Sequence, residues 1–281
     1  MSAFSVVGTG EGVIAEDRGL MSAYDAAAPT FERHRALPEA VRQAIRAAVL
    51  AALASPSPRL LDLGAGTGRI GEAFAAAGDD YVGVDLSLGM LRAFAARDYE
   101  TAAPRLAQTD GERLPFGDAT FDAVLLIQVF GGMRGWRRVL AEATRVLRPD
   151  GALVLGRTVA PPDGLDARLR DRLAQILRDL GAAPETKNTR EDAQRWLAAH
   201  AKRTQRVVAA TWTTERTARG FLDRHRTGAR FAALPAPVKD AALRRLADWA
   251  TTAFGSLDAA TAEQHAFELQ LFQFAPGGPH E

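Results

Sequence analysis

Between residues 60 and 157, short apolar runs alternate with stretches of helical periodicity, and this alternation limits the possible folds more than any other feature of the sequence. The runs are apolar almost throughout, which is typical of strands with both faces covered. Such strands form a parallel sheet with helices on both sides. We predict these strands at residues 59–63, 80–85, 104–109, 121–127 and 152–157. The pattern therefore predicts an α/β core.

The order of elements changes after residue 157. The sequence predicts helices at 163–181 and 190–202, a strand at 206–212, two helices within 214–254 and a strand at 266–274. The last strand alternates polar and apolar residues, as expected at a sheet edge. The helices between the final two strands exceed what a short connection needs, so we interpret residues 214–256 as an inserted helical cover over the site.

Three glycines spaced two apart, Gly64, Gly66 and Gly68, follow the first predicted strand and lead into a helix. They place bare backbone and a helix N-terminus at the carboxyl end of the sheet, where open α/β sheets bind ligands. A dinucleotide fingerprint would need glycine in place of Arg69, and a phosphate-binding P-loop would need a Gly-Lys-Ser/Thr ending that the chain lacks. The sequence therefore disfavours a pyrophosphate ligand.

The composition of the 281 residues excludes several classes of function. The chain has no cysteine, which excludes disulfides, a thiolate nucleophile, zinc–thiolate sites and iron–sulfur clusters. No apolar run is long enough to span a membrane and the N-terminus lacks a signal-peptide pattern, so we expect a cytoplasmic protein without a membrane partner. The net charge of +1 gives no argument for nucleic acid. The basic stretch at 195–230 is either a solvated helical face or a patch for an acidic substrate.

Five signatures occur in order along the core: LDLGAGTGR, YVGVDLS, TDGERLPF, FDAVLLIQVF and VLRPDGALVLG. Together they resemble the Rossmann-like, class I S-adenosylmethionine (SAM)-dependent methyltransferases that act on small molecules. The resemblance implies a doubly wound α/β fold with a mostly parallel seven-stranded sheet and an antiparallel edge strand, and SAM as the cofactor. It also implies an N-terminal arm with helices over the site (1–58), a SAM-binding core (59–160), and remaining core helices and edge strands with the inserted lid (161–281).

The resemblance further implies which residues surround the cofactor. The bend at 64–68 would approach the methionine part, and Asp62 would orient the bend and the ammonium group or simply form the turn. Asp85 would accept hydrogen bonds from both ribose hydroxyls, each contributing about 1.5–3 kcal/mol, or cap the next helix. The expected cofactor contacts are Tyr24, Asp62, Gly64, Ala65, Gly66, Gly68, Asp85, Leu86, Met90, Asp110, Gly111 and Gln128.

Several of these residues also suit other roles. Met90 would pack against the adenine face or belong to the core. Asp110 and Gly111 would bind the adenine edge through a side-chain acceptor and a backbone donor, and Asp110 also suits a loop turn. Tyr24 would reach over the cofactor carboxylate or lie at the surface.

Methyl transfer from a sulfonium is an in-line displacement, so positioning and exclusion of water can supply much of the acceleration. A general base helps where the acceptor is a hydroxyl, phenol or protonated amine. His34 and His225 are the first candidates for this base, and each also suits a solvent-facing position, so the catalytic residue stays unknown. No acidic pair follows the fourth predicted strand, and we expect no metal site.

Aromatic residues are candidates for the walls of an acceptor pocket. Gln128 and Phe130 would line the methyl-transfer zone or pack the end of a strand. Phe221 and other aromatic residues would add apolar walls from the cover, although their spacing also suits a core. The other aromatic candidates are Trp196, Trp212 and Phe231.

The sequence therefore predicts a SAM-dependent methyltransferase that acts on a small organic metabolite in an enclosed pocket. Two alternatives remain open. One is a SAM-binding protein with a regulatory or rearrangement role and no methyl transfer, and the other is a nicotinamide-dependent oxidoreductase, against which Arg69 argues. We expect no nucleic-acid partner. The acceptor, its methylated atom (O, N, C or S) and the oligomeric state stay open.

Overall fold

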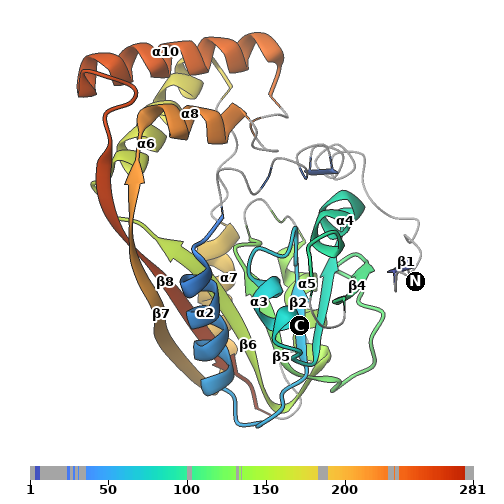
Figure 1. Ribbon diagram of the computed structural model, residues 1–281. Coiled ribbons are helices and arrows are strands. Elements are labelled where there is room, and N and C mark those ends of the chain that lie inside the picture. The colour runs from blue at the N-terminus through green and yellow to red at the C-terminus, as the bar shows by residue number, and fades with distance from the viewer. Residues whose placement is uncertain are drawn as a thin grey trace.

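A mixed sheet runs through the centre of the molecule and organises the other elements (Figure 1). The structure, a computed structural model, describes residues 4–6, 24–25, 28, 31, 36–99, 103–130, 133, 135–182, 189–226, 231 and 234–275. The strands are β1 (Phe4–Val6), β2 (Leu60–Leu63), β3 (Tyr81–Asp85), β4 (Arg105–Gln108), β5 (Phe121–Ile127), β6 (Leu147–Val159), β7 (Arg203–Arg216) and β8 (Thr261–Gln273). The helices are α2 (Glu39–Ala51), α3 (Gly71–Ala76), α4 (Leu88–Ala95), α5 (Trp136–Arg145), α6 (Leu165–Asp179), α7 (Thr189–His200), α8 (Ala218–Arg226) and α10 (Ala236–Phe254).

The strands follow the order β1-β4-β3-β2-β5-β6-β8-β7. Strands β1 to β6 pair in parallel, and β8 pairs antiparallel with both β6 and β7. The seven predicted strands are therefore present. An eighth, β1, was not predicted and pairs with β4 at the opposite edge of the sheet.

The final strand, β8, lies one position inside the edge, which is occupied by β7. Its alternation has a different cause from the one predicted. Phe267, Leu269 and Leu271 are buried in the apolar cluster on the α2 side, while the intervening Glu268 and Gln270 are only partly buried on the other face. The alternating pattern therefore reflects burial of one face and not an edge position.

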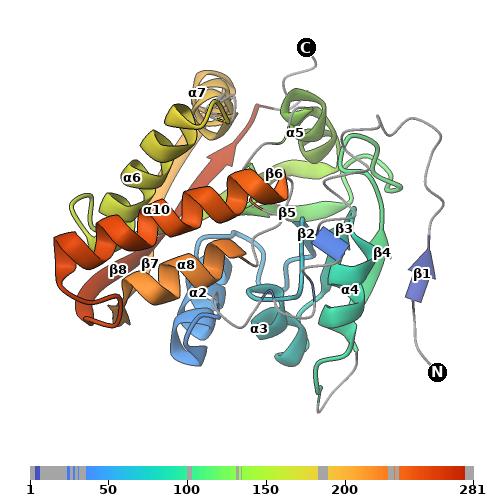
Figure 2. The same ribbon diagram turned by 90° about the horizontal axis from the view of Figure 1, so that it is seen from above.

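Helices cover both faces of the sheet (Figure 2). Consecutive strand residues Leu60 and Leu61 belong to different apolar clusters because their side chains point to opposite faces. Leu60 shares its cluster with Ile45 of α2, together with residues of α3 and α4. Leu61 shares the other cluster with Leu140 of α5 and Leu197 of α7. This arrangement confirms the predicted doubly wound α/β architecture.

Helices α6, α8 and α10 form a further layer beyond the carboxyl ends of the parallel strands (Figure 1). Their buried apolar residues make a third cluster, to which α6 contributes Leu169 and Leu173 and α10 contributes Leu246. The predicted cover at 214–256 includes α8 and α10 but leaves out α6, which the structure packs against both of them. We call α6, α8 and α10 the helical layer. None of the helices that the structure describes is long and apolar enough to cross a bilayer.

Candidate functional site

The chain makes a tight turn where β2 ends. Gly64, Gly66 and Gly68 all have positive φ values of 87°, 57° and 80°, which favour glycine. A Cβ at Gly68 would lie 2.1 Å from the Phe94 ring, and one at Gly64 would lie 2.4 Å from Val129. At Gly66 the nearest atom would be 3.9 Å away. The outer two glycines are therefore required by packing, whereas Gly66 faces open space at the carboxyl edge of the sheet.

The carboxylate of Asp85 holds this turn against the end of β3. One of its oxygens accepts from the Gly66 N–H at 2.9 Å and the other from the Ser87 N–H at 2.8 Å. Burial raises the pKa of Asp85, the N–H groups of Ser87, Gly66 and Leu86 lower it, and the charge of Asp25 raises it further. A carboxylate offers about four acceptor positions, so acceptor capacity beyond the N–H groups of Gly66, Ser87 and Leu86 stays available to a hydroxyl donor. Asp85 thus stands where the ribose contact is expected, and it also braces the turn.

Asp62 is the penultimate residue of β2 and lies beneath the turn. Its side chain is 3 % exposed and accepts a hydrogen bond of 2.7 Å from the hydroxyl of Tyr81. Burial raises the pKa of Asp62 from its ordinary 3.8 to about 7, the Tyr81 hydrogen bond opposes this rise, and the charge of Asp85 adds to it. Tyr81 was not among the predicted site residues. The sequence feature that could have indicated its role is the tyrosine at the start of the mostly apolar strand next to β2.

The residues expected on the adenine side of the cofactor flank the turn. The side chain of Met90 is buried in α4, and its N–H donates to Ser87 Oγ at 3.2 Å. A Cβ on Gly111 would lie 3.1 Å from Leu63, so the loop after β4 packs against the end of β2. Asp110 is exposed and accepts from the Glu112 N–H at 2.9 Å, as a loop-turn residue does. Its second carboxylate oxygen has no hydrogen-bond partner among the described residues.

The N-terminal segment reaches the same corner through Tyr24 and Asp25. Asp25 accepts hydrogen bonds from the Ser87 hydroxyl and, at 2.8 Å, from the Gly89 N–H. A Cβ on Gly89 would lie 2.9 Å from the Asp25 backbone, so this glycine permits a close approach. Asp25 was not predicted, because a contact across more than sixty residues leaves no local pattern. It fixes Tyr24, which is half-buried, beside the start of α4.

Gln128 connects the glycine turn to the end of β6. It has a positive φ of 60°, its Oε1 accepts from Arg69, and its Nε2 donates to Thr158 at 2.9 Å. The residue that argues against a dinucleotide fingerprint, Arg69, therefore holds Gln128 in place. Phe130 is 2 % exposed, packs in the cluster on the α5 side, and borders a cavity described below.

The predicted lid residues belong to the helical layer. Phe221 is 2 % exposed and belongs to the core of the helical layer, where the ring of His225 stacks on it at 4.1 Å. His225 Nδ1 lies 2.9 Å from the Phe221 carbonyl oxygen. Phe231 shares the same core, whereas Phe130 belongs to a different cluster. His34 lies outside the described residues.

The two tryptophans of the predicted walls are also separated. Trp196 packs edge-on against Trp136 at 6.5 Å, in the contact between α7 and α5. Trp212 lies on β7 with its ring 5.6 Å from that of His265 on β8. These two aromatic residues therefore belong to different parts of the fold.

A buried His–Glu pair joins the sheet to the helical layer and was not predicted. Glu263 and His265 are 4 % and 3 % exposed, with His265 Nε2 3.3 Å from Glu263 Oε2. Glu263 also accepts from the Leu165 N–H at the start of α6. The sequence feature that could have indicated this pair is the spacing of two residues between Glu263 and His265, which places both side chains on the same face of β8.

We expect Glu263→Ala to lower the free energy of unfolding by about 2–3 kcal/mol, because it leaves His265 and the α6 N-terminus without their buried acceptor. Urea unfolding followed by circular dichroism measures this loss. Glu215→Ala, an exposed glutamate of the neighbouring strand, is the control and should change stability by less than about 0.5 kcal/mol. Equal effects of the two variants would contradict the anchoring role.

The fold and the turn define a class of α/β protein that holds a ligand at the carboxyl edge of a parallel sheet. Residues 61–155 match the methyltransferase domain family. The demethylmenaquinone methyltransferase of Mycolicibacterium vanbaalenii is 35% identical over 169 residues, which is 58% of this chain and 71% of that protein. The chain therefore belongs to the class I SAM-dependent methyltransferases, and the nicotinamide alternative is set aside.

Solved structures show the same fold at low sequence identity. The YcgJ protein of Bacillus subtilis has a TM-score of 0.53 at 20% identity, over 82% of this chain and 98% of that one. The [4+2]-cyclase SpnF has a TM-score of 0.50 at 18% identity, over 92% and 94% of the two chains. Because a fold hosts more than one chemistry, these likenesses establish architecture only.

Proposed function

We propose that this chain binds SAM across the turn at Gly66 and transfers its methyl group to a small organic acceptor. One observation carries the proposal: the open backbone at Gly66 and the remaining acceptor capacity of the Asp85 carboxylate lie side by side, joined by a 2.9 Å hydrogen bond. A cofactor with a ribose diol and a compact charged tail matches this donor and acceptor set. The proposed division is an N-terminal arm (1–58), a SAM-binding core (59–160) and the rest of the chain with the helical layer.

Each neighbouring residue has a proposed task. Asp85 accepts from the ribose hydroxyls, and Asp62 compensates the positive charge of the ammonium group. The segment holding Tyr24 and the loop at Asp110 and Gly111 close over the two ends of the cofactor, with Leu86 and Met90 beneath the adenosine. Gln128, fixed by Arg69 and Thr158, bounds the side on which the acceptor approaches.

The chemistry requires little from acid–base groups. When bound, SAM supplies an electrophilic methyl group on a sulfonium, and the displacement proceeds in line. The task of the chain is to hold the acceptor in line with the methyl group and to exclude water from the space beneath the helical layer. Excluding water does not slow the reaction, because the positive charge on the sulfonium disappears as the methyl group is transferred. His225 is engaged in the core of the helical layer and is a less suitable base than the sequence suggested.

The first test is SAM binding by Asp85→Ala. Loss of two hydrogen bonds to a charged acceptor should weaken SAM binding at least about tenfold in isothermal titration calorimetry. The matched control is Asp80→Ala, which removes an aspartate paired with Arg105 just before the opposite end of the same strand. A wild-type chain that binds neither SAM nor its demethylated product below about 1 mM would end the proposal.

Binding alone does not separate transfer from a regulatory or rearrangement role. Single-turnover reactions with methyl-labelled SAM and a panel of small acceptors make this distinction. The panel includes demethylmenaquinone, named in the curated relative, beside phenols, amines and thiols. Label on a defined product supports the methyltransferase; tight SAM binding without transfer to any acceptor favours the SAM-binding alternative.

A further inference from the structure

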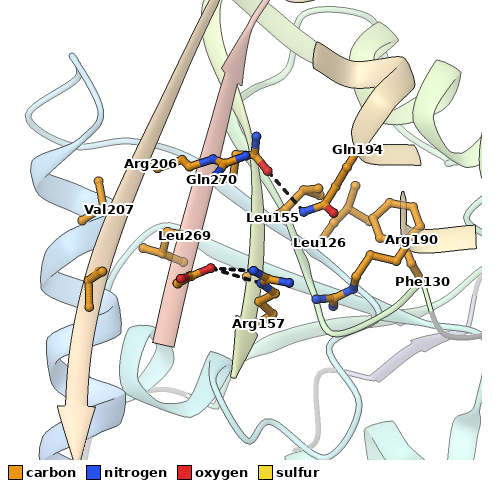
Figure 3. Close-up of a pocket in the computed structure, with 13 residues that line it drawn as sticks. Leu126, Phe130, Leu155, Arg157, Arg190, Gln194, Arg206, Val207, Leu269 and Gln270 are labelled. Carbon is orange, nitrogen blue, oxygen red and sulfur yellow. Dashed lines mark hydrogen bonds and ion pairs between the residues drawn. The ribbon is translucent and has the colours of Figure 1, made fainter. Parts of the chain in front are cut away.

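A cavity of about 310 Å³ opens on the α7 face of the sheet, across β6, β8 and β7 (Figure 3). Its volume lies at the lower end of small-molecule sites, about 300–1,000 Å³. None of the residues expected around the cofactor lines it. Its principal lining side chains are Leu126, Phe130, Leu155, Arg157, Arg190 and Arg206. Phe130, expected in the methyl-transfer zone, is part of the lining, and the carbonyl oxygen of Gly156 in the lining accepts from the Gln128 N–H at 3.0 Å. The cavity therefore borders the side on which the acceptor is proposed to approach, and ligand binding to it can be measured without methyl transfer.

The charged lining of this cavity is unbalanced. It contains three arginines and one carboxylate, Glu268, which leaves an excess of two positive charges. Glu268 is already engaged, because its Oε2 accepts from Arg157 Nη2 at 2.8 Å and from Arg157 Nε at 3.2 Å. Neither Arg190 nor Arg206 has a carboxylate partner within the described ranges. The described part of the lining therefore favours an anionic ligand.

Arg190 is the most constrained of these cations. Figure 3 shows its side chain extending from the start of α7 toward Arg157. Burial lowers the pKa of Arg190, and the like charge of Arg157 lowers it further. Two guanidinium groups are neighbours here, and the half-buried one, Arg190, has no carboxylate partner among the residues that the structure describes. This arrangement raises the free energy of the pocket until an anion neutralises Arg190.

The remaining walls indicate what kind of anion fits. Leu126, Phe130 and Leu155 form an apolar side, each buried in the cluster on the α5 and α7 face. On the polar side, Gln194 Nε2 of α7 donates to Gln270 Oε1 of β8 at 3.2 Å and ties the helix to the sheet. A fully hydrated inorganic ion gains nothing from the apolar side, whereas an organic anion buries its carbon skeleton there.

We infer that this cavity binds a small organic carboxylate, with the carboxylate paired to Arg190 and the apolar part against Leu126, Phe130 and Leu155. A planar guanidinium matches a carboxylate through two parallel hydrogen bonds, which makes arginine well suited to the contact. Arg206, exposed on β7, adds positive charge at the rim and attracts the anion. Arg157 stays paired with Glu268 and shapes the inner wall.

The test uses benzoate as the probe, with benzamide and inorganic phosphate as comparisons, in isothermal titrations of the full chain at low ionic strength. Benzoate should bind at least about tenfold more tightly than benzamide, because only the carboxylate compensates Arg190. Arg190→Gln should weaken benzoate binding by about tenfold or more. The matched control, Arg203→Gln, removes an exposed charge from the same strand as Arg206 but outside the cavity, and should change affinity less than about twofold.

A variant that binds benzoate more tightly tests the same site without the possibility that misfolding explains a loss of binding. Glu268→Gln frees Arg157, so benzoate affinity should rise by about threefold or more. Equal binding of benzoate and benzamide, equal losses in the Arg190 and Arg203 variants, or tighter binding of phosphate than benzoate would each overturn the inference. Unchanged SAM affinity in Arg190→Gln shows that the variant is folded and separates this site from the proposed function.

Discussion

Gly68→Ala is expected to destabilise the chain by roughly 3–5 kcal/mol, a large part of the stability of an ordinary domain. Two effects add. The residue has a φ of 80°, which strains any side chain, and the new methyl carbon would lie 2.1 Å from the ring of Phe94. Phe94 belongs to α4 and is fully buried in the apolar cluster on the α2 side of the sheet, so its ring has no space to withdraw. Urea unfolding and the yield of folded protein measure the loss.

Gly66→Ala is the matched control two residues earlier. Its φ of 57° lies where alanine is tolerated at a cost of about 1 kcal/mol, and its new methyl carbon meets no atom nearer than 3.9 Å. The variant should therefore fold. Its methyl group would occupy the open side of the turn, so SAM affinity should fall by at least about tenfold. Full SAM affinity in Gly66→Ala would show that the cofactor does not lie on this turn, and a stable Gly68→Ala would contradict the packing argument.

The parallel core could be predicted because its signal is local. An aliphatic run such as residues 123–127 of β5 indicates a strand covered on both faces, and the glycine spacing after β2 indicates a turn at the ligand edge. The position of Asp85 at the end of a strand follows from the same pattern. These features depend on neighbouring residues only.

The remaining features depend on contacts between distant segments. Strand β1 has three residues and forms only by pairing with β4, about one hundred residues later. Helix α6 has the amphipathic pattern of any surface helix, and only the third apolar cluster reveals that it packs with α8 and α10. Asp25 and Tyr81 reach the site through hydrogen bonds to Ser87 and Asp62, whose partners cannot be read from spacing.

Asp62 should make the stability of the folded chain depend on pH. Its pKa is about 7 in the folded chain, raised mainly by burial, and close to the ordinary 3.8 when unfolded. Between these two values the unfolded chain has released a proton that the folded chain retains, so stability falls as pH rises from 4 to 7 and levels off above 7. The fall should reach up to roughly 4 kcal/mol.

Asp62→Asn removes this titration and keeps an acceptor for the Tyr81 hydroxyl. Relative to the wild type, the variant should gain stability between pH 5 and pH 8, as measured by urea unfolding at each pH. Asp98→Asn changes an exposed aspartate and should leave the wild-type pH dependence as it is. Parallel pH profiles of the wild type and Asp62→Asn would contradict the raised pKa.

The same group should couple SAM binding to proton release. A positive ammonium group beside Asp62, as proposed, favours the carboxylate and lowers its pKa, so SAM binding near pH 6 should expel part of a proton. Titration calorimetry in buffers of different ionisation enthalpy detects this proton, and it should disappear in Asp62→Asn. If Asp62→Asn still releases a proton on binding SAM, the ammonium group does not lie beside Asp62. Whether SAM binds at the turn is tested separately by the Asp85→Ala and Gly66→Ala variants.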